Sequence, residues 1–201
     1  MKRAIVLMGV AILVALSLAA ISVVTPRQLS AGPPIEQPAP TATPASTGVV
    51  LCSAGVRISN SYFSYGAGWN LVAGFHDRVL SGNLGPIYRY RPDDGSYIAE
   101  PPNTPLETGV GYWAYFPAPQ TGPTIVDSPR SLTLPLPAGE YVLIGNPIPA
   151  LVAARGADAL YVYDPDTDGY TNALTLHPGQ GAWAYTATGG VITLTNATTC
   201  T

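Results

Sequence analysis

An internal repeat with a period of about 70 residues constrains the fold of this chain more than any other feature. Three segments recur in the same order in both halves: residues 68–74 match 139–145, residues 88–92 match 161–165, and residues 109–115 match 179–185. Three matches in one order indicate a duplicated unit, with copies at about 56–126 and about 127–195. We therefore expect two similar substructures within one folded domain.

The local pattern in each copy is that of β-strands. Tyr88 and Tyr90 occupy alternate positions in the first copy and therefore lie on one face of a strand, and the second copy repeats this pair. Asp-Gly pairs at 94–95 and 168–169 separate strand-like segments. They predict hairpin turns in which the glycine adopts positive φ.

One segment, residues 149–155, has a helical pattern, because a proline stands at its start and Gly156 follows its end. The other segments are short, strand-like and regularly spaced. Together they predict an all-β fold, either an antiparallel sandwich or a compact pseudo-symmetric barrel.

The composition is typical of an exported β protein. Charged residues make up 10% of the chain, compared with about 25% in soluble proteins, whereas glycine and proline number 21 each. Lys2 is the only lysine, and the formal net charge is −3. Because nucleic-acid binding needs a basic surface, this composition excludes nucleic acid as a partner.

The N-terminus, residues 1–24, has the layout of a targeting segment. Lys2 and Arg3 precede an uncharged apolar stretch at 4–24. This stretch is longer than the usual signal-peptide core of about 7–15 residues and close to the roughly 20 residues that span a bilayer. It is therefore either a cleaved signal peptide or a retained membrane anchor. In both cases the preceding positive charge places the following domain outside the cytoplasmic membrane.

Residues 25–48 are rich in Pro, Ala and Thr and predict a semi-rigid linker before a β domain at 49–201. Cys52 and Cys200 lie near the two ends of this domain. In an oxidising compartment such a pair is expected to form a disulfide, with two free thiols as the alternative.

The first copy has the order Gly-Trp-Asn-Leu, Tyr-x-Tyr, an Asp-rich turn and Gly-x-Gly-Tyr-Trp, at 68–71, 88–90, 93–95 and 109–113. This order resembles the tandem β modules of many secreted or surface-attached bacterial and archaeal proteins. The second copy departs from it, with Ala182 where the first copy has tyrosine. The resemblance implies attachment, display or binding rather than catalysis, and it brings no functional residues with it.

Three carboxylates at alternate positions, Asp164, Asp166 and Asp168, precede Gly169. Calcium prefers several hard oxygen ligands, which a tight loop of this kind supplies. The loop is not a standard EF-hand, because Thr175 stands where that motif has a bidentate glutamate. The two interpretations are a calcium site and a polar hairpin turn.

Aromatic residues are the second candidate feature. Three tryptophans, Trp69, Trp113 and Trp183, accompany twelve tyrosines. Exposed in a row, such rings stack on sugars or contact a protein partner, whereas their period-2 placement equally fits core packing. Four tyrosines lie near predicted turns and are the candidate ligand-binding residues: Tyr62, Tyr65, Tyr97 and Tyr170.

The motifs of known catalytic sites do not accompany either histidine, His76 or His177, so we expect both to be loop residues and the chain not to be an enzyme. The predicted function is a non-catalytic extracytoplasmic module for envelope attachment, display or protein binding. The alternative is a carbohydrate-binding module, with calcium as a candidate cofactor. The expected partner is therefore an envelope protein or a glycan, together with the membrane if the N-terminal segment is retained.

Overall fold

The computed structural model describes residues 64–75, 78–101, 103–121 and 129–197. The described residues form antiparallel strands and contain no helix, which confirms the predicted all-β fold. The targeting segment, the linker, Tyr62, His76 and both cysteines lie outside the described residues. In the described part of the chain, no helix is long and apolar enough to cross a membrane.

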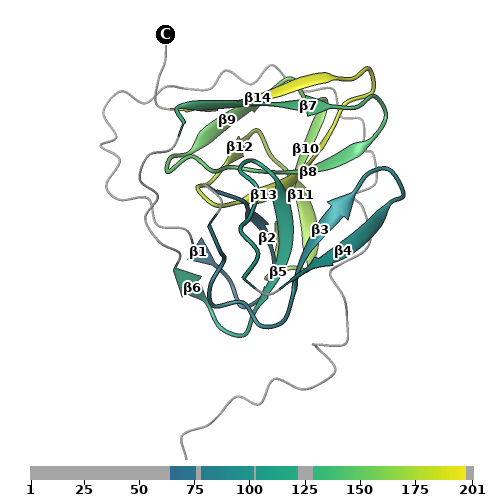
Figure 1. Ribbon diagram of the computed structural model, residues 1–201. Coiled ribbons are helices and arrows are strands. Elements are labelled where there is room, and N and C mark those ends of the chain that lie inside the picture. The colour runs from purple at the N-terminus through teal and green to yellow at the C-terminus, as the bar shows by residue number, and fades with distance from the viewer. Residues whose placement is uncertain (1–63, 76–77, 102, 122–128, 198–201) are drawn as a thin grey trace, which may run out of the picture.

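Two four-stranded sheets form the centre of the molecule (Figure 1). The first contains β2 (Gly68–Ala73), β5 (Gly111–Phe116), β3 (Ile87–Arg91) and β4 (Ser96–Glu100), in that order. The second contains β8 (Tyr141–Gly145), β13 (Gly181–Tyr185), β10 (Ala159–Asp164) and β11 (Gly169–Asn172), in that order. Strands that match in sequence therefore occupy the same places in their two sheets.

Two further layers flank this central pair of sheets, as Figure 1 shows. A third four-stranded sheet has the order β12 (Thr175–Leu176), β9 (Val152–Arg155), β14 (Gly190–Asn196) and β7 (Ser131–Leu136) and lies beside the second central sheet. A two-stranded ribbon of β1 (Ser64–Tyr65) and β6 (Gln120–Thr121) lies at the opposite end of the molecule.

The segment with the helical pattern is a strand, so this prediction was wrong. Val152 to Arg155 form β9, which pairs with β14 on one side and β12 on the other. Val152 is fully buried in the core between this sheet and the second central sheet. The short segment gains two sets of ladder hydrogen bonds and buried apolar area as a strand, and these outweigh a weak local helix propensity.

Strand pairing shifts the match between residues 68–74 and residues 139–145 by one position. Ala73 lies opposite Gly111, and Gly145 lies opposite Gly181, so Ala73 rather than Gly74 is equivalent to Gly145. The reason is the pleat, because a shift of one residue would turn the strand's apolar face away from its core.

The two hairpin turns differ in the residue that adopts positive φ. In the first hairpin it is Gly95, with φ of 66°, as the Asp-Gly pattern predicts. In the second hairpin it is Asp168, with φ of 50°, and not Gly169. The pairing of Asp164 with Gly169 places Gly169 in β11, so the preceding residue must make the turn.

Three apolar cores separate the layers. Val72, Phe75 and Phe116 belong to the core on the outer face of the first central sheet. Ile144 and Leu194 belong to the core between the second central sheet and the third sheet. The remaining core lies between the two central sheets and consists mostly of aromatic side chains.

Candidate functional site

An aromatic layer joins the two central sheets. Trp113 of β5 packs edge-on against Tyr163 of β10, with ring centroids 4.8 Å apart and an interplanar angle of 77°. Trp183 of β13 packs in the same way against Tyr90 of β3, at 4.7 Å and 79°. Each tryptophan therefore contacts the second tyrosine of the Tyr-x-Tyr strand in the other copy. Both indole rings are fully buried, so these residues pack in the core.

Backbone hydrogen bonds join the same two sheets at one corner. The Ala73 N–H donates to the Gly179 carbonyl at 2.8 Å, and the Gly145 N–H donates to the Gly109 carbonyl, also at 2.8 Å. Isolated bridges pair Val72 with Gln180, and Val110 with Ile144. The two copies thus make reciprocal contacts. Each contributes the end of one central strand, β2 or β8, and the turn before another, β5 or β13.

Glycines at the start of β5 and β13 permit this close approach. A Cβ atom at Gly111 would lie 2.5 Å from the Ile144 carbonyl oxygen, and one at Gly181 would lie 2.9 Å from the Val72 carbonyl oxygen. Both distances are shorter than a carbon and an oxygen atom can approach without displacement. The second glycine of each Gly-x-Gly motif is therefore explained by backbone packing between the copies, whereas the first adopts positive φ, 83° at Gly109 and 72° at Gly179.

The candidate tyrosines that the structure describes do not form a row at the surface. Tyr65 is 5% exposed, stacks on Phe116 at a centroid distance of 4.8 Å, and donates its hydroxyl to the Gly179 carbonyl at 3.2 Å. Tyr97 and Tyr170 are half-buried at the edge of the aromatic layer. The Tyr170 hydroxyl accepts a hydrogen bond from the indole nitrogen of Trp183 at 3.3 Å.

The three candidate calcium ligands make hydrogen bonds within their hairpin. Asp164 accepts from the Asp166 N–H at 3.0 Å and from the Thr167 hydroxyl at 2.9 Å. Asp168 accepts a hydrogen bond from the Tyr163 hydroxyl. These bonds cap the turn and fasten it to the aromatic layer. The described residues contain no group of three His, Cys, Asp or Glu side chains arranged to hold a metal ion.

A calcium effect on stability tests the metal interpretation of this loop. Binding at the loop would raise the melting temperature in excess calcium relative to chelator, because a ligand of the folded state stabilises it by mass action. Asp166→Asn is the variant to compare, since Asp166 is exposed and donates only through its backbone. Equal melting temperatures in calcium and in chelator for both proteins would leave the loop as a turn.

A pocket of about 340 Å³ lies where the β1–β2 segment meets the β10–β11 turn and the loop before β13. Its walls include Leu71, Pro165 and Pro178. Its polar lining includes Ser64, Tyr65, Asn70, Tyr163, His177 and Gln180. The sequence analysis did not detect this site, because its residues come from three separate segments and no motif links them.

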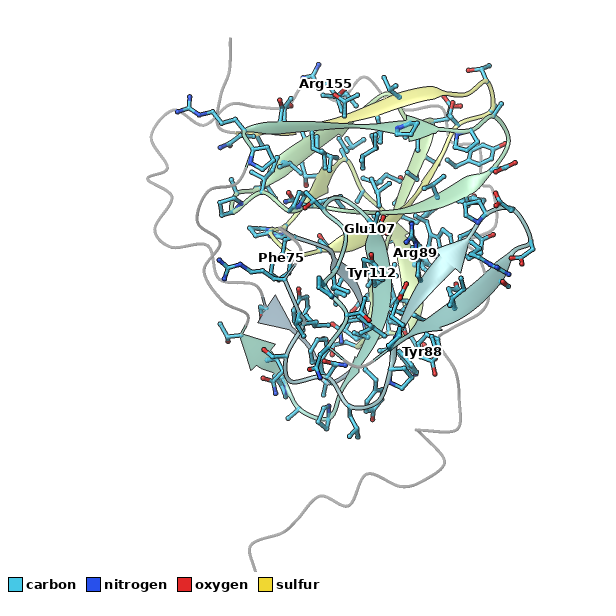
Figure 2. All side chains as sticks on the ribbon, viewed as in Figure 1. Phe75, Tyr88, Arg89, Glu107, Tyr112 and Arg155 are labelled. Carbon is cyan, nitrogen blue, oxygen red and sulfur yellow. The ribbon has the colours of Figure 1, made fainter. Side chains whose placement is uncertain are left out.

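A bidentate ion pair joins β3 of the first central sheet to the loop before β5. The Arg89 guanidinium donates to both carboxylate oxygens of Glu107, at 2.5 and 3.1 Å (Figure 2). The Glu107 N–H donates to the hydroxyl of Tyr112 at 3.0 Å. Because both charged side chains are substantially exposed, the pair contributes only about 0.2–1 kcal/mol and serves to hold the 103–110 loop on the sheet.

Buried tyrosine hydroxyls make the domain sensitive to high pH. Burial raises the pKa of Tyr141 to about 12, and the neighbouring hydroxyls of Tyr161 and Tyr185 act in the same direction. Burial also raises the pKa of Tyr65, Tyr97 and Tyr163. In Tyr163 the contact with Asp168 adds to this effect, because a phenolate beside a carboxylate is unfavourable.

We expect the free energy of unfolding to change little between about pH 7 and pH 9 and to fall steeply above about pH 10. The folded state keeps its tyrosine protons above the pKa of the unfolded chain, so each such tyrosine stabilises the fold below pH 10 and loses that contribution as pH rises. Urea unfolding at a series of pH values measures how the free energy of unfolding changes with pH. In Tyr141→Phe, the free energy of unfolding should fall less steeply with pH above pH 10 and should be unchanged at pH 7. The reason is that the Tyr141 hydroxyl is buried with no hydrogen-bond partner among the described residues. An unchanged slope would contradict this.

Comparison with known proteins gives no relatives for this chain: no family model, no curated protein and no solved structure matches it.

Proposed function

We propose that the chain is a non-catalytic extracytoplasmic module that attaches to or is displayed on the cell envelope, or binds an envelope protein. The targeting segment and the Pro/Ala/Thr-rich linker support this location. The low charge and the disulfide expected between Cys52 and Cys200 are typical of proteins exported to an oxidising compartment.

The observation that carries the proposal is the use of the aromatic residues. Trp113 and Trp183 are fully buried between the two central sheets. Among the described residues, every tryptophan, tyrosine and phenylalanine side chain is buried or half-buried, and the exposed large apolar side chains are all aliphatic. An aromatic platform for polysaccharide requires rings that face solvent. The aromatic residues are therefore better explained as core packing that makes the domain rigid than as a surface on which glycans stack.

We also propose that the domain is a pair of duplicated units that pack as a sandwich. Support comes from the shared strand order of the two central sheets and from the reciprocal contacts of Trp113 and Trp183. Such a body suits a display or attachment module, because its strands are held by pairing within the sheets and by hydrogen bonds between them.

Cell fractionation of full-length protein tests the location. We expect the protein in the envelope fraction, sensitive to protease added outside the cytoplasmic membrane, and crosslinked to an envelope protein or glycan. A variant lacking residues 4–24 is the matched control and should remain in the cytoplasm. Recovery of the full-length protein in the cytoplasmic fraction would refute the proposal.

A carbohydrate-binding module remains the second candidate. The observation that favours it is the pocket between the copies, which is lined by uncharged polar groups and apolar walls. This pocket is a different site from a row of exposed aromatic rings, and it includes only Tyr65 of the candidate tyrosines.

A further inference from the structure

The pocket between the two copies presents polar atoms that the fold itself does not use. Gln180 accepts the His177 N–H through its side-chain oxygen at 2.9 Å, and the described residues show no hydrogen bond from its side-chain NH₂ group. The described residues show no hydrogen bond to the His177 ring or to the Ser64 hydroxyl, and both side chains belong to exposed residues. Donors and acceptors therefore converge on one cavity from two segments.

Other polar groups of the pocket are committed to holding its walls. The Asn70 side chain donates to the carbonyls of Gly66 and Gly68, at 2.9 and 3.1 Å, and accepts from the Gly66 N–H at 3.1 Å. The Tyr65 hydroxyl donates to Gly179, and the Tyr163 hydroxyl donates to Asp168. These bonds preorganise the cavity, so a ligand would not have to order it.

The charges of the lining restrict the ligand class. Among the described residues, no Lys, Arg, Asp or Glu lines this pocket, so none of these side chains offers a counter-ion to a charged ligand. The amide of Gln180, the imidazole of His177 and the hydroxyl of Ser64 offer both donors and acceptors. Leu71, Pro165 and Pro178 supply flat apolar contacts. A neutral ring with hydroxyl groups at its edge and C–H groups on its face matches this set.

The corresponding region of the other copy lacks these groups. Glu107 and Val110 stand at the positions equivalent to His177 and Gln180. There the turn at Gly109 is covered by the β7 side chains of Leu132 and Leu134, which lie within 3.5 Å of where a Cβ atom would be. Because the same backbone forms with either set of residues, the fold does not require His177 and Gln180.

We propose that this pocket binds one neutral sugar residue of an envelope glycan, through Gln180, His177 and Ser64. The inference rests on the proposed envelope location and names the contact that attaches the module. A volume of about 340 Å³ is at the lower end of the range for small-molecule sites, which fits a single ring rather than an extended chain.

The test is saturation-transfer NMR with full-length protein in a detergent that carries no sugar head group. The probes are glucose, galactose, mannose and N-acetylglucosamine, with glucuronic acid and a proline-rich peptide as chemically different probes. We expect transfer to at least one neutral sugar. Gln180→Ala should weaken binding by about tenfold. Ser64→Phe, which replaces a lining hydroxyl by a bulky ring, should abolish the transfer.

Glu140→Ala is the matched control, because Glu140 is exposed and lies outside the lining of the pocket. It should retain the transfer, and circular dichroism should show that all three variants fold. Three results would overturn the inference. They are no transfer to any neutral sugar, transfer in both pocket variants equal to that in the unchanged protein, and transfer only to glucuronic acid or the peptide. A protein that fractionates with the envelope but fails this test refutes the pocket inference alone, whereas recovery in the cytoplasm refutes the proposed function.

Discussion

Replacing Trp113 or Trp183 by alanine is expected to lower the free energy of unfolding by about 3–5 kcal/mol. Both side chains are fully buried, and each packs on a tyrosine of the other copy. Truncation would remove this edge-to-face contact and leave a cavity between sheets that are fixed by their strand pairing. Equilibrium urea unfolding, followed by circular dichroism, measures the change.

Trp69→Ala is the matched control for these two variants. Trp69 is half-buried at the edge of the same aromatic layer, with its ring centroid 6.4 Å from that of Trp113. The Trp69→Ala substitution would leave a gap that is open to solvent. It should therefore lower the free energy of unfolding by less than alanine at either core tryptophan does. If the three variants lose equal stability, or if the loss at Trp113 is below about 1 kcal/mol, the aromatic layer does not join the two copies as described.

Gly111→Ala is expected to destabilise the domain by about 1–3 kcal/mol, although alanine normally stabilises an extended strand relative to glycine. The added methyl group would meet the Ile144 carbonyl oxygen at 2.5 Å, and a backbone atom cannot turn aside as a flexible side chain can. Relief requires the two central sheets to separate at the corner where Gly145 donates to Gly109. Gly181→Ala should also destabilise the domain, but by less, since its added Cβ atom would lie 2.9 Å from the Val72 carbonyl oxygen.

Gly169→Ala is the control that isolates packing from chain entropy. Gly169 is also a strand glycine, and the nearest atom to its added Cβ is the Thr167 hydroxyl oxygen at 3.7 Å. This substitution should be neutral or slightly stabilising in the same thermal and urea unfolding measurements. A loss at Gly169 as large as that at Gly111 would show that the close approach of the sheets is not the cause.

Much of the fold was predictable because local pattern and tertiary structure agree. The alternation of Tyr88 and Tyr90 places both rings on the inner face of β3, where they join the aromatic core. The Asp-Gly pattern predicted the first hairpin and its positive φ at Gly95. Of the two interpretations that the sequence left open for Trp113 and Trp183, the structure supports core packing, because β5 and β13 are covered on both faces.

The remaining features depend on pairing between distant segments. Residues 152–155 carry a weak helical signal but become β9, because β12 and β14 are both present to pair with them. Asp168 takes the positive φ in its hairpin because the pairing of Asp164 with Gly169 sets the register of the turn. Neither result follows from the residues of the segment alone.

The sequence by itself determined the all-β class and the places of several strands and turns, because these depend on side-chain period and turn chemistry within short segments. Only the tertiary structure decided how the copies meet. It placed Gly111 and Gly181 against a facing backbone, directed the tryptophans into a shared core, and assembled the pocket around Gln180. Such contacts join residues far apart in the chain, and they are fixed by the packing of whole sheets rather than by the preference of any one segment.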